Sequence, residues 1–293
     1  MASDEEGAPA ARQLPGHIAA ALAGAGGATD SAGRPWAGRS LTGDDAKIHN
    51  FEDDDGTANA GYLAAVGALR AGTGDEAAVV ASLATARVFI PIVAQLAEEE
   101  ETVHGLHADK QADMALVTLK AADGRTALPA FTSAAALSHW HPEARPVAVY
   151  AARAALSAVA EGAELLVLDP GAEVTFVVRR PAVWALAQQR DWMPSYADRE
   201  LAAEMGRAAN GFPAVRRIEV LPGRGVPARS ADGSTIPGGG AGPELQAVLY
   251  LEEGLDAAAV QQLVAGLQAE WSRNVLFGER VDSIEIKLRR ASQ

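Results

Sequence analysis

The sequence has 293 residues, and 48% of them are hydrophobic, which is enough to form a large core. It contains no cysteine, so disulfides, thiolate metal sites and a cysteine nucleophile are excluded. The net charge is −13, with most of the acidic excess in residues 1–110, so a nucleic-acid backbone would be repelled.

The first 56 residues differ in composition from the rest of the chain. They are rich in Ala, Gly and acidic side chains, and they begin without the basic start and apolar stretch of a secretory signal. No later segment sustains the length of a membrane span. We expect residues 1–56 to be a flexible acidic lead-in to a soluble, cytoplasmic protein that does not bind membranes. Residues 57–192 and 193–293 then form two folded domains.

The first domain opens with helical signals followed by a strand. Residues 58–69 predict one helix, and Asp75 caps a second. The apolar run Val88–Val93 predicts a strand, interrupted by Pro91. Proline cannot donate to a ladder, so we expect Pro91 to lie at an edge or a bulge.

A hairpin and a helix come next. Residues 114–119 and 126–131 flank an Asp-Gly pair at 123–124, which is typical of a tight antiparallel turn. Thr132 or Ser133 then caps a short helix.

The remainder of the first domain alternates strands and helices. This rhythm predicts partly parallel pairing with hairpins added, and therefore a mixed β-sheet covered by helices. The expected segments are strand 147–150, helix 152–160, strand 165–168, turn 169–171, strand 174–178 and a helix that starts at Pro181.

The second, smaller domain reads as β-β-α-β, which is half of a ferredoxin-like sandwich. Such a unit leaves apolar surface uncovered, so we expect it to pack on the first domain or on a second copy. The whole chain is therefore predicted to have an α+β fold. The expected segments are helix 198–209, strand 215–221, flexible loop 222–243, strand 245–251, a helix capped by Asp256 and strand 283–288.

Several stretches, in order, resemble the actinobacterial branch of the SseB family, the "enhanced serine sensitivity" proteins with an SseB N-terminal domain. The stretches are RVFIPIVA, ADMALVTL, ALPAFTSAAALSHWHP, AARAALSAVAEGA, ELLVLDPG and VTFVVRRPAVWALA. The resemblance implies an α/β N-terminal domain followed by a smaller C-terminal one. It implies no catalytic residue and no cofactor, because the family name records a phenotype and not a reaction.

The candidate binding site lies where a strand passes into a helix, because free backbone N–H groups and the helix dipole favour an anion there. A turn after another strand would supply the opposite wall. The alternative is that the same residues only cap the helix and fill the core. The candidate residues are Phe131, Thr132, Ser133, Trp140, Asp169 and Gly171.

Catalysis and metal binding find less support in the residues. A hydrolase or transferase with Ser133 as nucleophile is the alternative function, but Ser133 lacks the Gly-x-Ser-x-Gly elbow, and His139 lies nearly opposite on the helix. His104 and His107 have helical spacing without the Glu of a His-Glu-x-x-His site, so we expect no metal and no cofactor.

These observations favour a non-catalytic module that binds a small anionic ligand or a protein segment. Its C-terminal domain would mediate self-association or partner binding. A purely structural scaffold is a third reading.

Overall fold

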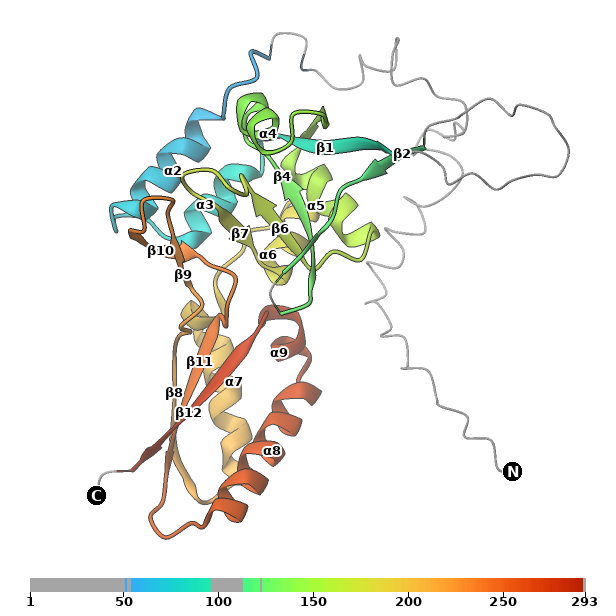
Figure 1. Ribbon diagram of the computed structural model, residues 1–293. Helices are drawn as coiled ribbons and strands as arrows, with labels where there is room; N and C mark the ends of the chain where they lie inside the picture. Colours follow the sequence, from blue (N-terminus) through green and yellow to red (C-terminus); the bar gives the residue numbers. More distant parts are fainter. Residues whose placement is uncertain (1–50, 52–53, 96–112, 122, 292–293) are drawn as a thin grey trace, which may run out of the picture. The chain divides into compact units, whose positions relative to one another are not determined.

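The structure, a computed structural model, describes residues 51, 54–95, 113–121 and 123–291 (Figure 1). The expected lead-in therefore lies almost wholly outside the described residues, as do His104 and His107. Residues 53–293 cluster as one compact unit. Within it, residues 54–192 are called the N-terminal part below, and residues 193–291 the C-terminal part.

The N-terminal part begins with two helices and an antiparallel sheet. Asn59 and Asp75 cap the helices with their side chains, as the sequence predicts for Asp75. The sheet has the order β2-β1-β5. The elements are α2 (Ala60–Arg70), α3 (Glu76–Leu83), β1 (Arg87–Gln95), β2 (Asp113–Leu116) and β5 (Arg145–Tyr150).

Strand β1 is the central strand of this sheet, and Pro91, expected at an edge or a bulge, lies where β1 has no ladder partner on the side away from β5. Pro91 lies opposite Pro146 of β5. Phe89 exchanges backbone hydrogen bonds of 2.7 and 2.8 Å with Phe131 on the other side of β1. Backbone groups two residues apart point the same way, so residue 91 faces away from β5, and the ladder with β2 starts only at Ile92. Pro91 therefore breaks no ladder bond.

A second, mixed sheet lies next to the first, in the order β3-β4-β6-β7. Strands β4 and β6 are parallel and the other pairs are antiparallel. The predicted hairpin is confirmed, with Leu119 opposite Ala127, although its first arm is divided between β2 and β3. The strands are β3 (Leu119–Lys120), β4 (Thr126–Ala130), β6 (Leu165–Leu168) and β7 (Phe176–Val178).

Helices α2 and α3 pack with α5 (Ala151–Ala160) and α6 (Arg180–Ala187) around the strands of the N-terminal part. Helix α5 is rich in alanine, and its small buried side chains let it lie close to the neighbouring elements. The short helix α4 (Ala134–Trp140) contributes Leu137 to a smaller cluster with Phe89 and Phe131.

The C-terminal part confirms the predicted β-β-α-β order. Its sheet has the order β12-β11-β8, with β11 antiparallel to β8 and parallel to β12. Trp271 is buried below the sheet and donates its indole N–H to the Met205 carbonyl at 3.3 Å. The elements are η2 (Ser195–Ala197), α7 (Arg199–Ala208), η3 (Ala209–Gly211), β8 (Val215–Pro222), β11 (Leu245–Leu251), α8 (Ala257–Arg273), α9 (Val275–Arg280) and β12 (Ile284–Arg290).

The segment 222–243, expected as a flexible loop, contains a hairpin of β9 (Pro227–Arg229) and β10 (Thr235–Gly239). Ile236 of this hairpin is buried in the core of the N-terminal part. A Cβ on Gly239 would come within 2.4 Å of the Phe176 ring. The glycines that suggested flexibility therefore allow the close approach of β10 to the N-terminal part. Together the two parts form an α+β fold.

Candidate functional site

The structure brings the predicted residues Thr132 and Asp169 together. They follow β4 and β6, which are parallel neighbours, so both residues lie beside the C-terminal ends of these strands. The backbone N–H of Thr132 donates to Asp169 Oδ1 at 2.7 Å, and its hydroxyl donates to Oδ2 at 2.6 Å. Both residues are buried.

The Asp169 carboxylate thereby occupies the donors that an external anion would use. Burial raises the pKa of Asp169, and the two hydrogen bonds from Thr132 oppose that rise. Ser133 caps α4, because its Oγ accepts the Ala136 N–H at 3.1 Å. A carboxylate of the protein itself therefore binds at the junction where the sequence predicts an external anion.

The other predicted residues are neighbours in the same region. The rings of Phe131 and Trp140 have centroids 5.2 Å apart, and Phe131 is fully buried. Gly171 has a positive φ of 81°, and a Cβ there would lie 3.8 Å from Trp140 Cδ1. Thr132, Ser133 and Asp169 therefore form a polar junction beside an aromatic pair.

The described residues do not arrange Ser133 as a nucleophile. Ser133 Oγ is engaged as a helix cap. His139 lies in the last turn of α4, and His141 is the residue directly after this helix. The Nδ1 atom of His141 is buried and has no hydrogen-bond partner among the described residues. Within the described ranges, no three His, Asp or Glu side chains are grouped so that they could hold a metal ion.

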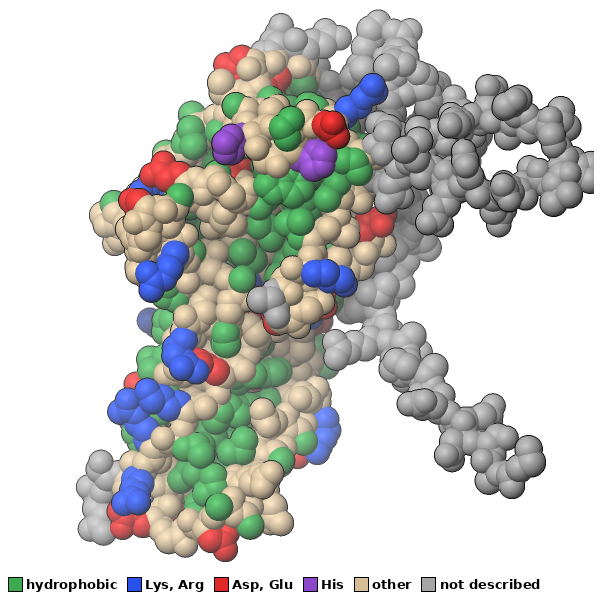
Figure 2. Space-filling view, viewed as in Figure 1, with side chains coloured by type: hydrophobic (Ala, Val, Ile, Leu, Met, Phe, Trp, Pro, Cys, Tyr) green, Lys and Arg blue, Asp and Glu red, His purple; other side chains and the backbone are tan. Residues whose placement is uncertain are grey.

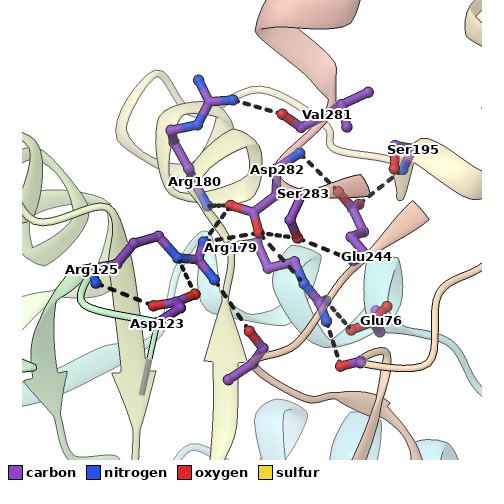
Figure 3. A network of polar contacts seen from close by, with 12 residues as sticks. Glu76, Asp123, Arg125, Arg179, Arg180, Ser195, Glu244, Val281, Asp282 and Ser283 are labelled. Carbon is purple, nitrogen blue, oxygen red and sulfur yellow. Dashed lines mark hydrogen bonds and ion pairs between the residues drawn. The ribbon is translucent and has the colours of Figure 1, made fainter. Parts of the chain in front are cut away.

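Sequence reasoning missed a buried network that joins the two parts of the chain, drawn in Figure 3. Its carboxylates and guanidinium groups come from helices, turns and a strand end far apart in the sequence. We call it the buried network and define it by five residues: Glu76, Arg125, Arg179, Glu244 and Asp282.

Glu76, the first residue of α3, is 2% exposed and holds one side of the buried network. Its Oε1 accepts the Gly239 N–H at 2.7 Å and an Arg179 N–H at 3.2 Å. Its Oε2 accepts the Tyr196 hydroxyl at 2.8 Å. Arg179 also donates to the Gly225 carbonyl at 2.9 Å. One carboxylate thus holds the hairpin, η2 and the start of α6 together.

Asp282, just before β12, holds the other side. Both of its oxygens accept Arg125 Nη1 at 2.9 Å, and its Oδ2 lies 4.0 Å from Arg179 Nε. Arg125 follows the Asp-Gly turn of the N-terminal hairpin, where Asp123 binds its Nε at 2.7 Å. Burial opposes the charge of Arg125, but Asp282 and Asp123 outweigh it and raise the pKa of the guanidinium.

Glu244 completes the buried network with its side chain closed off from solvent. Its two oxygens accept the backbone N–H groups of Ser195 and Asp282, each at 3.0 Å. Burial raises the pKa of Glu244, and these two hydrogen bonds together with the Arg179 charge oppose the rise. The carboxylate thereby ties η2 to the turn that precedes β12.

One signal in the sequence could have indicated this network. Arg179 and Arg180 lie at the N-terminus of the apolar helix α6, where the helix dipole disfavours positive charge. Two arginines at such a position suggest carboxylate or carbonyl partners elsewhere. Arg180 indeed donates to the carbonyl of Val281 at 2.6 Å and to that of Gly278 at 3.2 Å.

The C-terminal part also carries an apolar groove between α8 and the edge strand β12. In Figure 2 hydrophobic side chains gather over this region of the C-terminal part. The hollow measures about 550 Å³, and Leu288 of β12 is 45% exposed beside it. We call it the α8–β12 groove; its lining residues are Leu255, Ala257, Val260, Gln261, Val264, Ala265, Gln268 and Leu288.

A second hollow continues from the groove toward the end of β12. It shares Leu255, Val260 and Leu288 with the first, and it adds both acidic and basic side chains at the rim. The charged rim residues are Glu252, Glu253, Arg289 and Arg290.

None of the helices formed by the described residues combines the length and apolar character needed to cross a bilayer. No curated protein and no solved structure matches the chain. Residues 63–185 match the family described as the SseB protein N-terminal domain. They contain α3, both sheets of the N-terminal part and most of α2 and α6. By this match residues 63–185 are an SseB N-terminal domain.

Proposed function

We propose that this chain is a protein-interaction module, in which the SseB N-terminal domain supports a C-terminal β-β-α-β unit that binds a protein partner. The observation that carries the proposal is the α8–β12 groove. Apolar side chains of α8 and the half-exposed Leu288 line it, beside a strand that, among the described strands, pairs with β11 alone. Exposed apolar grooves rimmed by polar residues are typical of interaction surfaces.

The buried network supports this proposal by fixing the C-terminal part relative to the SseB domain. Arg125 and Arg179 of the N-terminal part meet Asp282, which directly precedes Ser283 and β12. Removing one member of a buried ion pair costs about 3–5 kcal/mol, because the other charge is then left buried without a partner. The groove is therefore presented at a defined position on the domain.

The Thr132–Asp169 junction has a structural part in this proposal. The Asp169 carboxylate takes both donors of Thr132 and thereby joins the ends of β4 and β6. A small anionic ligand would have to displace this carboxylate from two short hydrogen bonds. The geometry favours a protein partner at the groove over an anion at the junction.

Photo-crosslinking in cells tests the proposed function. A photoreactive amino acid replaces Gln268, an exposed residue at the groove, or Arg153, an exposed residue of α5, as the matched control. We expect discrete protein adducts from position 268 and not from position 153. Adducts from neither position, or the same adducts from both, would contradict an interaction role for the groove.

A further inference from the structure

We propose that the partner at the groove is an acidic, amphipathic segment of another protein, which adds to the edge of β12 as an extended strand. This inference rests on the proposed function, because it uses the same α8–β12 groove. It adds the chemistry of the partner and the way in which the partner binds.

The end of β12 carries three exposed cations, Lys287, Arg289 and Arg290. None of the ion pairs formed among the described residues includes any of the three. Glu285 of the same strand is already bound within the chain, because it accepts hydrogen bonds from Arg224 and Gln246 at 2.8 and 2.7 Å. The end of β12 is thus a cationic surface on a chain whose net charge is −13, and it would attract carboxylates.

The acidic residues near this surface do not neutralise it. Glu252 and Glu253 lie at the rim of the second hollow together with Arg289 and Arg290. Glu252 is paired with Arg216, so Glu253 alone among the described rim residues offsets the two arginines. In Figure 2, Lys and Arg side chains gather along the side of the C-terminal part next to its hydrophobic area.

The two faces of β12 differ in chemistry. Ile286 packs in the core of the C-terminal part, on the helix side of the sheet, and Leu288 lines the groove on that side. Side chains alternate along a strand, so Lys287 and Arg289 point to the other face. A strand lying beside β12 would therefore meet apolar side chains on one face and cations on the other. The matching segment alternates apolar and acidic side chains.

The backbone of β12 can receive such a strand. Leu245 of β11 donates to the Ser283 carbonyl at 3.0 Å, so the backbone groups of odd-numbered residues in this segment face β11. Because backbone direction alternates along a strand, the N–H and C=O groups of Ile286 and Leu288 face the other edge, where no described strand pairs. Extended peptides bind to sheet edges of this kind through their own backbone groups.

The cations also decide which strands this edge accepts. A second copy of the chain would bring the same three cations to the edge, and like charges directly opposite each other destabilise a sheet. The positive charge therefore disfavours self-pairing and favours an acidic strand.

Fluorescence anisotropy with a synthetic peptide tests this proposal. The probe is a labelled, end-blocked peptide in which valine and glutamate alternate, and it is titrated with the full chain. We expect saturable binding that weakens as salt is raised, because the carboxylates and cations remain partly exposed. The same peptide with lysine in place of glutamate is expected not to bind, and equal binding of the two peptides would overturn the proposal.

A matched pair of variants locates the binding surface. Arg289→Glu should weaken binding of the valine–glutamate peptide about tenfold, because it replaces an attraction with a repulsion of similar size. Arg153→Glu makes the same substitution at an exposed arginine of α5 and should leave the affinity unchanged. Circular dichroism verifies that both variants are folded. Equal affinities of the two variants would overturn the proposal.

Backbone methylation of the peptide separates strand addition from simple charge attraction. Methylating the backbone nitrogens of the valines removes the donors of one edge of the extended peptide, and methylating those of the glutamates removes the donors of the other. One of the two peptides should lose binding, because a strand pairs with β12 through a single edge. Undiminished binding of both would show that the peptide does not extend the sheet.

The crosslinker at position 268 distinguishes this inference from the proposed function. Discrete protein adducts together with no peptide binding would reject the acidic strand and retain the interaction role. Neither adducts nor peptide binding would reject both. Binding of a labelled oligonucleotide in place of the peptide, lost in Arg289→Glu, would overturn the proposal in favour of a nucleic-acid surface.

Discussion

Buried carboxylates in this protein bind backbone N–H groups as well as side chains. Asp169 accepts the N–H of Thr132, Glu76 accepts that of Gly239, and Glu244 accepts those of Ser195 and Asp282. Each carboxylate therefore fixes the course of a loop or turn. Such hydrogen bonds are charge-assisted, and they satisfy donors that would otherwise be buried without a partner.

Glu244 should give the stability of the protein a specific pH dependence. Its pKa in the folded state is raised above the ordinary 4.5, chiefly by burial, so the folded state binds more protons than the unfolded state in the interval between the two values. Its contribution to the free energy of unfolding therefore increases as pH falls through the folded pKa toward 4.5, and is constant below that.

Urea unfolding of the wild type and of Glu244→Gln across this pH range checks the prediction. The Gln side chain does not titrate, so the free energy of the wild type minus that of the variant should rise as pH falls. A difference that is flat, or that falls with decreasing pH, would contradict the raised pKa.

Among the secondary-structure elements, the β9–β10 hairpin shows how composition can mislead. Its glycine-rich flanks are typical of a flexible loop. In the structure, a Cβ on Gly238 would come within 2.4 Å of the Glu76 side chain. A Cβ on Gly239 would come equally close, 2.4 Å, to the Phe176 ring. The hairpin can pack this closely because these positions have no side chain.

A matched pair of glycine substitutions measures this packing. Gly239 and Gly233 have positive φ angles of 77° and 83°, but a Cβ on Gly233 meets nothing within 4 Å. Gly233→Ala should lower the free energy of unfolding by about 1–2 kcal/mol through backbone strain alone. Gly239→Ala should lower the free energy of unfolding by a further ~1–3 kcal/mol, because the added methyl group clashes with Phe176.

Chemical denaturation monitored by tryptophan fluorescence gives both values. Equal losses for the two variants would show that the close approach of β10 to Phe176 does not contribute to stability.

At the scale of the whole molecule, the buried network joins the N-terminal and C-terminal parts. Arg179 is 1% exposed and lies between Glu76 and Asp282, at 3.2 and 4.0 Å. It is the cation that the two carboxylates share. The stability of the contact between the N-terminal and C-terminal parts should therefore depend strongly on this side chain.

Arg179→Met should lower the free energy of unfolding by about 3–5 kcal/mol, because it leaves the buried Glu76 carboxylate without its cation, although Asp282 keeps Arg125. The control is Arg70→Met, which removes an exposed ion pair with Glu173 and should cost at most ~1 kcal/mol. Urea unfolding gives both values, and similar losses for the two variants would contradict a central role for Arg179.

Part of the candidate site could be read from the sequence. The sequence predicts that Thr132, Ser133 and Asp169 lie close together, because strand ends and capping residues are local signals. That Asp169 itself takes the donors of Thr132 could not be predicted, since it depends on the parallel pairing of β4 with β6.

The amino-acid sequence alone was enough to predict the β-β-α-β order, the Asp-Gly hairpin, the helix caps and the α+β class. These features follow from hydrophobic period, turn residues and capping hydrogen bonds, all of which act over a few residues. The contacts between the two parts were decided only by the tertiary structure. Glu76 accepts the N–H of Gly239 across 163 positions, and Arg125 binds Asp282 across 157. No local preference encodes such pairs, because they form only when the packed core brings distant elements within hydrogen-bond distance.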